Sequence, residues 1–317
     1  MLKQLEGSSA LVTGGTGVLG RPLVSGLLKA GARVHLVLRP RSSPPPESRG
    51  AEIHEADILD PEALTKVARA AAPERVFHLA GKNDPSRTFE AANENLTVNT
   101  RGTLNVLEAC ASLKLLSFVF TSTTEVYGNN RAPFKESQRP DPPSPYAVSK
   151  LAAENFCTYY HRTRQVPATV LRLSSCYGPY LKKPRLVAAV FSACFNPGET
   201  LDLTSGRQKR DFLFAGDAVE ALLKASVTPG AAGETINAAG KTPYSVKEVA
   251  EAILAVAGRE PRIRWNAIQR RPNENQVWKT DLSKAKKLLG WSPATGLKQG
   301  LKLTAEWWRR TALPSGA

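Results

Sequence analysis

The feature that most restricts the fold is a glycine-rich stretch near the N-terminus, TGGTGVLG at residues 13–20. It follows a short apolar run at 10–13 and precedes an expected helix at 21–30. In a strand–loop–helix unit, Gly14 permits the tight turn, Gly17 lets the backbone approach a pyrophosphate, and Gly20 lets helix and strand pack closely. The helix N-terminus adds amide groups and a positive dipole end. The stretch therefore predicts a dinucleotide-binding loop.

Apolar runs and helical patterns alternate through the first half of the chain. We expect strands at 10–13, 34–38, 53–56, 76–79 and 117–120, with helices at 21–30, 61–71 and 98–112. Asp60 and Pro61 form a helix-start signal, and Asp217 is expected to cap a helix at 218–226. Such alternation predicts an α/β fold with a Rossmann-type, doubly wound parallel sheet.

The pattern changes after residue 172, where prolines and glycines interrupt the chain more often. Helices expected at 183–195, 246–256 and 297–309 indicate a smaller C-terminal domain. We predict a dinucleotide-binding domain at 1–174, with a return segment at about 211–238, and a smaller substrate-binding domain at 175–317.

Composition excludes several classes of protein. No run of 18 apolar residues exists, so we expect no membrane span, and the N-terminus has no signal-peptide pattern. The cysteines are scattered without a CxxC pair, which indicates buried free thiols in a reducing, cytoplasmic compartment. The histidines are equally dispersed along the chain, so we expect no metal site.

The chain has 43 basic and 28 acidic residues, a formal net charge of +15. This excess is compatible with nucleic acid, with a polyanionic small substrate, or with a basic surface that has no specific partner. The basic residues are spread along the chain, and no nucleic-acid-binding motif is present. Nothing specific therefore supports a nucleic-acid partner.

The residues at the end of the second expected strand indicate whether the cofactor is NAD or NADP. An acid there would bind the ribose 2′-hydroxyl of NAD, but this chain has Arg39 and Arg41 instead. Because a guanidinium pairs well with a phosphate, Arg39 favours NADP, with NAD as the alternative. Asp57 and Ile58 follow the third strand, where they would contact the adenine.

Tyr146 and Lys150 are four residues apart, so on a helix they share one face. Tyrosine titrates near pH 10 (roughly), and a neighbouring cation favours its phenolate. Tyr146 is therefore a candidate proton acceptor for a sugar or alcohol hydroxyl.

Together these motifs resemble the extended short-chain dehydrogenase/reductase family, and within it the NAD(P)-dependent epimerases and dehydratases of nucleotide sugars. The resemblance rests on TGGTGVLG, VFHLAG (76–81), TSTTEVYG (121–128), SPYAVSK (144–150), LRLSSCYGP (171–179), RDF (210–212) and LGWSP (289–293). It covers nearly the whole chain and implies a homodimer that acts on a nucleotide diphosphate sugar.

The resemblance also implies site roles. It implies Tyr146 as base, Thr123 as its hydrogen-bonding partner, Lys150 on the nicotinamide ribose, and Arg210 and Arg271 on the substrate diphosphate. Glu274 matches the acid on the nucleoside ribose. The implied cofactor-binding set is Gly14, Thr16, Gly17, Val18, Leu19, Gly20, Arg39, Asp57, Ile58, Leu79, Ala80, Asn99, Tyr146 and Lys150. Thr124 and Ser175 complete the substrate set, although the family usually has Asn where this chain has Ser175.

Glu125 bears on the reaction without deciding it. A carboxylate here could remove the sugar C5 proton, as in related dehydratases, but simple epimerases and reductases also carry it. Thr124 stands where deoxythymidine-diphosphate-glucose dehydratases have an acid. Three hypotheses follow: an epimerase or dehydratase that passes through a keto sugar, an NADPH-dependent reductase of a 4-keto-6-deoxy sugar, and a non-catalytic cofactor- or RNA-binding protein.

Overall fold

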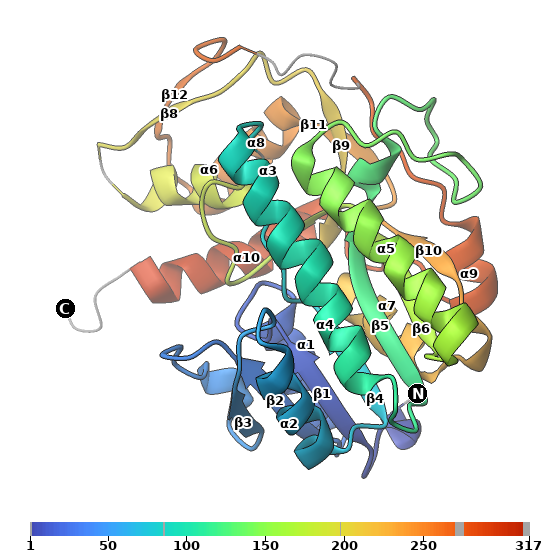
Figure 1. Ribbon diagram of the computed structural model, residues 1–317. Helices are drawn as coiled ribbons and strands as arrows, with labels where there is room; N and C mark the ends of the chain where they lie inside the picture. Colours follow the sequence, from blue (N-terminus) through green and yellow to red (C-terminus); the bar gives the residue numbers. More distant parts are fainter. Residues whose placement is uncertain (1, 85, 197, 270–275, 313–317) are drawn as a thin grey trace.

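The structure is a computed structural model that describes residues 2–84, 86–196, 198–269 and 276–312. Strands and helices alternate along most of the chain (Figure 1). The strands are β1 (Ser9–Thr13), β2 (Arg33–Leu38), β3 (Glu52–Glu55), β4 (Arg75–His78), β5 (Ser117–Thr123), β6 (Ala168–Leu173), β7 (Ser175–Tyr177), β8 (Thr200–Asp202), β9 (Lys209–Phe214), β10 (Thr235–Ala238), β11 (Pro243–Ser245) and β12 (Arg262–Arg264). The helices are α1 (Gly20–Lys29), α2 (Pro61–Ala71), α3 (Phe89–Asn95), α4 (Gly102–Cys110), α5 (Pro145–Arg164), α6 (Leu186–Phe195), α7 (Ala215–Val227), α8 (Val246–Ala257), α9 (Ser283–Leu289) and α10 (Leu297–Ala312).

Seven strands form one parallel sheet in the order β10-β6-β5-β4-β1-β2-β3. The order along the chain reverses between β1 and β4. In open α/β sheets, ligands bind outside the carboxyl ends of the strands at such a reversal. The predicted Rossmann-type α/β fold is confirmed, and the sheet places the cofactor site beside the glycine-rich loop.

Helices cover both faces of this sheet, so its strands are largely buried apolar runs. On one face, α1 and α7 contribute Leu27 and Leu222 to a core that also contains Leu36 of β2. On the other face, α2, α4 and α5 pack against β4 and β5, with Leu64 and Phe118 in the shared core. The carboxyl ends of the strands remain open between these layers.

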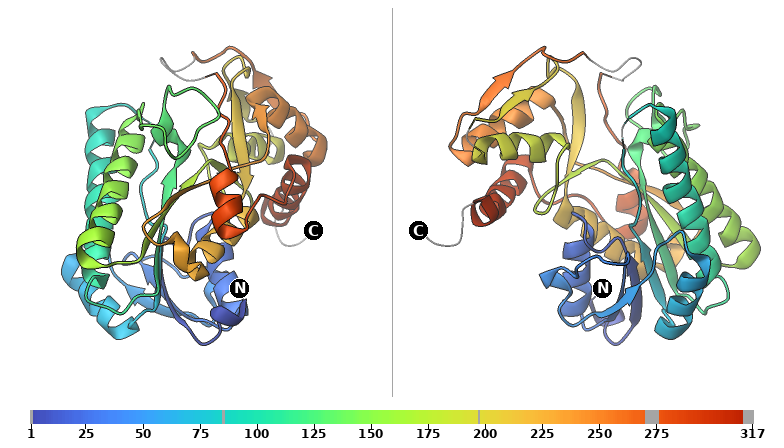
Figure 2. Two further views of the ribbon diagram at one scale, coloured as in Figure 1. Left: turned by 90° about the vertical axis from the view of Figure 1, so that its right-hand side faces the viewer. Right: turned by 60° about the vertical axis from the view of Figure 1, so that its left-hand side comes forward.

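A second lobe rises beside the carboxyl ends of the strands (Figure 2). Helices α6, α8 and α10 enclose a third core around Phe191, Ile253 and Leu301, next to the small sheets β11-β9-β7 and β12-β8. Strand β10 then returns to the edge of the large sheet. This path is compatible with a domain boundary at residue 174 and a return segment at about 211–238. That division of the chain stays a proposal.

Two helix starts show how local signals succeed or fail. Helix α2 begins at Pro61, and the Asp60 carboxylate accepts a hydrogen bond from the backbone N–H of Ala63 at 3.0 Å, as predicted. The prediction that Asp217 caps a helix at 218–226 was wrong, because α7 already begins at Ala215. The Asp217 carboxylate instead accepts hydrogen bonds from the backbone N–H and the hydroxyl of Thr295.

The helix expected at 98–112 is also different in the structure. Helix α4 begins at Gly102 and is preceded by a π-helical segment, Leu96–Arg101, that continues from α3. Single π-helical turns often occur at functional sites, and this one contains Asn99.

Among the helices of the described chain, none is both long and apolar enough to span a bilayer. The four cysteines carry free thiols. Three are buried as expected, whereas Cys176 is only half-buried and lines a pocket.

Candidate functional site

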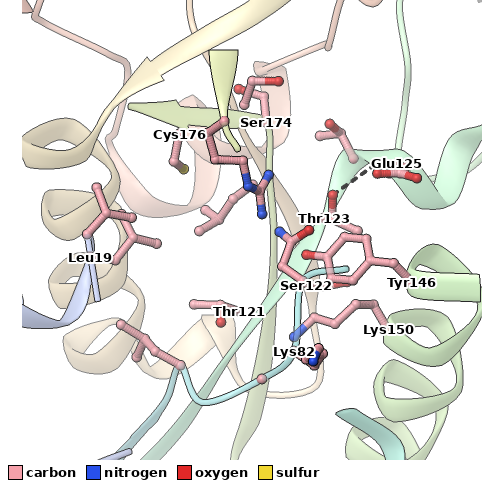
Figure 3. Close-up of a pocket in the computed structure, with 18 of the residues that line it drawn as sticks. Leu19, Lys82, Thr121, Ser122, Thr123, Glu125, Tyr146, Lys150, Ser174 and Cys176 are labelled. Carbon is pink, nitrogen blue, oxygen red and sulfur yellow. Dashed lines mark hydrogen bonds between the residues drawn. The ribbon is translucent and has the colours of Figure 1, made fainter. Parts of the chain in front are cut away.

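A pocket lies beyond the carboxyl ends of β5 and β6, between the large sheet and the second lobe. Many of the residues that line it come from three segments that are far apart in the sequence: 121–125, α5, and 173–176 (Figure 3). Val18 and Leu19 of the glycine-rich loop line it as well. An adjoining pocket runs from this loop to the end of β2. The fold thus brings most of the predicted residues together at one edge of the sheet.

The three glycines of the loop have different surroundings. Gly14 has a φ of +75°, and a Cβ there would lie 2.5 Å from the backbone nitrogen of Ala80. A Cβ on Gly20 would lie 2.2 Å from the carbonyl oxygen of Gly14. A Cβ on Gly17 would meet only that oxygen, at 3.6 Å. Packing therefore requires glycine at 14 and 20, while Gly17 leaves the loop backbone open toward a ligand.

The adjoining pocket, hereafter the cofactor pocket, has the lining expected for a dinucleotide. Its walls include Thr16 and Gly17 of the loop, and Leu79 and Ala80 after β4. Its far end contains three further predicted residues, Arg39, Asp57 and Ile58. The open glycine backbone at the start of α1 would hold the phosphates, and these three residues at the far end would meet the adenosine.

Asn99 shapes this pocket from behind. Its side chain is fully buried and does not line either pocket in the described part of the chain. Its Oδ1 accepts from the backbone N–H of Lys82 at 2.7 Å, and its Nδ2 donates to the Lys82 carbonyl and to the Ser149 hydroxyl. Asn99 therefore holds the segment after β4 against α5, and its contact with the cofactor stays a prediction.

Tyr146 and Lys150 project from the first turns of α5 into the first of the two pockets, hereafter the catalytic pocket (Figure 3). The helix begins at Pro145, and the Ser144 hydroxyl accepts from the backbone N–H of Ala147 at 3.1 Å. The Lys150 ammonium lies 4.2 Å from the centroid of the Phe120 ring. The cap fixes where α5 starts, and therefore which residues face the pocket.

Burial dominates the electrostatics of this pair. It raises the pKa of Tyr146 above its ordinary value, as does the Glu125 charge, while Arg185 and a hydrogen bond with Thr123 lower it. Burial lowers the pKa of Lys150 to about 8. We expected Lys150 to supply the charge that favours the phenolate. That role of Lys150 stays a prediction, and Arg185 is a further cation that lowers the Tyr146 pKa.

Thr123, Glu125 and Ser144 are linked by hydrogen bonds, and the first two line the pocket. Thr123 ends β5, and its hydroxyl accepts from the backbone N–H of Glu125 at 3.1 Å (Figure 3). The Ser144 hydroxyl donates to the Glu125 carboxylate at 2.5 Å. The Glu125 carboxylate is therefore held by the N-cap of the helix that carries Tyr146.

The predicted substrate residues fall into three groups. Thr124 and Ser175 line the catalytic pocket. Among the described residues, Trp278 lines the catalytic pocket, whereas Arg210 does not. The Arg210 guanidinium lies 4.9 Å from the centroid of the Trp278 ring. Arg271 and Glu274 lie outside the described residues.

Comparison with known proteins agrees with this geometry. The model of the NAD dependent epimerase/dehydratase family matches residues 10–239. The chain belongs to this family. The resemblance inferred from the motifs is confirmed, and the protein is an enzyme of the NAD-dependent epimerase/dehydratase type.

Individual relatives within the family carry different activities. A dTDP-glucose 4,6-dehydratase of Xanthomonas campestris pv. campestris is 30% identical, over 94% of this chain and 92% of its own. An epimerase of Methanothermobacter thermautotrophicus superposes with a TM-score of 0.90 at 30% identity, covering 98% and 94%. A UDP-glucuronic acid 4-epimerase of Bacillus cereus, solved with UDP-glucuronic acid and NAD, has a TM-score of 0.84 at 27% identity, covering 95% and 99%.

Sequence reasoning missed Arg185 and Cys176, which line this epimerase/dehydratase pocket. Lys82 and Ser122 also line it, although the sequence predicted no role for either. A signal for Arg185 was present, because it is the N-cap of α6 with no side-chain capping bond. A cation is disfavoured at the positive end of a helix dipole, so its presence there indicates another purpose.

Proposed function

We propose that the enzyme is a 4-epimerase of a nucleotide diphosphate sugar. The observation that carries this choice is that Glu125 supplies the one carboxylate among the described residues that line the catalytic pocket. Removing water from a keto sugar needs a base at C5 and an acid for the departing hydroxyl. Epimerisation at C4 needs neither group. The described residues that line the catalytic pocket therefore suit epimerisation better than dehydration.

Tyr146 is proposed to take the proton of the C4 hydroxyl and later to return it. The Thr123 hydroxyl, hydrogen-bonded to Tyr146, shares the developing charge on the sugar oxygen. Lys150 would bind the nicotinamide ribose, and its ammonium would supply a positive charge there. The nicotinamide, when bound, would supply a reversible acceptor for the C4 hydrogen. Between the two transfers the 4-keto sugar turns over in the pocket.

Glu125 is proposed to orient α5 and a sugar hydroxyl, because its carboxylate is already engaged by Ser144. Thr124 is buried beside it and has no acid to offer, unlike the corresponding residue implied for dTDP-glucose dehydratases. A reductase would use the same Tyr146 chemistry but would consume NADPH in stoichiometric amounts. An epimerase needs its cofactor only in catalytic amounts.

The substrate is proposed to be a UDP-type hexose or hexuronic acid. Arg210, beside Trp278, would bind the diphosphate together with Arg271, while Glu274 would bind the nucleoside ribose. Ser175 and Thr124 would contact the sugar. Arg185 places a cation in the pocket, which favours the carboxylate of a hexuronic acid such as the one bound by the Bacillus cereus relative.

For the cofactor we propose a preference for NADP over NAD. Strand β2 ends at Leu38 without an acid, and the exposed Arg39 lines the cofactor pocket, where its guanidinium would pair with a 2′-phosphate. The test is the ratio of Kd values for NADP and NAD in the wild type and in Arg39→Ala. The proposal predicts a ratio that favours NADP and is lost in the variant.

We also propose a homodimer through α5 and the α3 segment. Phe89, Leu96, Val148 and Tyr159 leave large apolar surfaces exposed on these neighbouring elements, with Phe89 81% exposed. A second copy would cover them around a twofold axis. Light scattering after gel filtration should give the dimer mass, and Tyr159→Glu should shift it toward the monomer.

The substrate proposal is tested by a thermal-shift screen of UDP-, GDP-, CDP- and dTDP-sugars with NAD and NADP. A ligand that binds only the native state raises Tm by mass action. We expect UDP-glucose or UDP-glucuronic acid to raise Tm most. If no nucleotide sugar shifts Tm at millimolar concentration, the nucleotide-sugar proposal is wrong.

A further inference from the structure

Two of the four histidines, 19 residues apart in the sequence, meet on one face of the large sheet. His35 is on β2, and Glu52 and His54 are on β3, the last strand at this edge of the sheet. The parallel register pairs His35 with Glu52 and Val37 with His54. Because alternate residues of a strand share a face, the three side chains lie on the same side. The expectation of no metal site rested on spacing along the chain, which does not record this register.

The donor atoms of these side chains form a small triangle. Nδ1 of His35 lies 3.0 Å from Nε2 of His54. One oxygen of Glu52 lies 3.4 Å from His35 Nδ1, and the other lies 3.4 Å from His54 Nε2. Zinc bonds to nitrogen and oxygen are about 2.0–2.2 Å long, so neighbouring donors of a tetrahedral site stand roughly 3.3–3.5 Å apart. The three distances, which involve both oxygens of Glu52, are each close to this spacing. With one donor atom from each residue, the three atoms lie within 4.8 Å of one another.

The surroundings hold the two rings while leaving the carboxylate accessible. The His35 and His54 side chains are 11% and 12% exposed, and their rings stack with centroids 5.3 Å apart. The Glu52 side chain is 63% exposed, so solvent reaches the open side of the triangle. A cation could enter there and keep a water molecule as its fourth ligand.

We propose that His35, Glu52 and His54 bind one divalent transition-metal cation of the zinc class, which fastens β3 to β2. Two imidazoles and one carboxylate suit zinc, whereas magnesium and calcium prefer sites made of oxygen alone. Within the described residues, none of the three lines the catalytic or the cofactor pocket. The cation would therefore stabilise an edge strand and take no part in the chemistry. This proposal is independent of the sugar substrate.

The test uses the full-length protein without a polyhistidine tag, stripped with a chelator and dialysed against Zn²⁺ in the absence of nucleotides. Elemental analysis of the wild type should give one bound zinc per chain, and excess Mg²⁺ should not displace it. His54→Gln should lose the bound zinc, and Glu52→Gln should weaken binding at least tenfold. Glu55→Gln, an exposed carboxylate on the same strand, is the matched control and should keep wild-type binding.

Zinc should also raise the Tm of the wild type and of Glu55→Gln, but not that of His54→Gln. The proposal is overturned if the wild type retains no zinc, or if His54→Gln and Glu52→Gln bind zinc as the wild type does. The latter result would assign the zinc to other residues and leave a hydrogen bond between the two rings. If His54→Gln fails to fold, the exposed Glu52→Gln decides the question.

Discussion

The guanidinium of Arg172 and the carboxylate of Glu154 form a two-point ion pair beneath the catalytic pocket. Nη2 of Arg172 lies 2.7 Å and Nε 3.1 Å from the two carboxylate oxygens, and both side chains are almost fully buried. The same carboxylate accepts a hydrogen bond from Ser122, which lines the pocket, and its charge raises the pKa of Lys150. The pair thus ties β6, β5 and α5 together behind the reacting groups.

Removing the Glu154 charge should destabilise the protein strongly. Glu154→Gln leaves the Arg172 guanidinium buried without a counter-charge, which typically costs about 3–5 kcal/mol. The free energy of unfolding in urea measures the loss. The control is Glu251→Gln, which breaks an exposed pair with Lys247 and should cost less than about 1 kcal/mol. Equal effects of the two substitutions would contradict the role of the buried pair.

Two glycines of α1 should respond in opposite directions to alanine. Gly20→Ala places a Cβ 2.2 Å from the Gly14 carbonyl oxygen and should cost about 1–3 kcal/mol, together with cofactor affinity. Gly26→Ala meets only Leu223 at 3.8 Å and should gain about 0.4–1 kcal/mol. Denaturation curves and NADP titrations of both variants check this. A Gly20→Ala protein that binds NADP like the wild type would contradict the packing argument.

Arg185→Gln should impair proton transfer at Tyr146. The Arg185 charge lowers the Tyr146 pKa, so its removal raises that pKa and moves the rising limb of kcat/KM to higher pH. We expect a loss of roughly three- to tenfold at pH 7, since a change of one pKa unit corresponds to a factor of ten. Lys182→Gln removes a nearby exposed cation and should leave the pH profile in place. An unshifted pH profile of kcat/KM in Arg185→Gln would contradict the effect of Arg185 on the Tyr146 pKa.

Asp211 should make the protein less stable as pH rises. Burial raises the pKa of its carboxyl to about 7 from an ordinary 3.8. The folded state therefore holds the proton more tightly than the unfolded state, and this stabilisation is lost between about pH 4 and pH 7. Asp211→Asn should match the wild type near pH 4 and exceed its free energy of unfolding by about 2–4 kcal/mol at pH 8. A constant difference at all pH values would contradict the assignment.

Local signals in the sequence were enough for the large sheet and for much of the site. The glycine-rich loop, the Asp60 cap and the spacing of Tyr146 and Lys150 act over a few residues, and the structure shows each element where it was expected. Local rules also misled. Asp217 looks like a cap, but its partner is Thr295, a residue 78 positions away that the sequence gives no reason to place beside it.

The residues that the sequence did not reveal depend on contacts between distant elements. Arg185 reaches the pocket because the second lobe places α6 beside Tyr146. His35 and His54 meet because β3 pairs with β2 in one particular register. The place of Arg185 at a helix start is visible in the sequence, but its approach to Tyr146 and the meeting of the two histidines are not, so both contacts required the assembled sheet and lobe.

The central claim is epimerisation at C4, and the most direct measurement is product analysis after turnover of UDP-glucose and UDP-glucuronic acid in D₂O. We predict a C4 epimer of unchanged mass, without deuterium at carbon, formed with catalytic amounts of NADP and abolished in Tyr146→Phe. A product that has lost one molecule of water and carries deuterium at C5 would contradict the claim and show a dehydratase. Stoichiometric consumption of NADPH would contradict it in favour of a reductase.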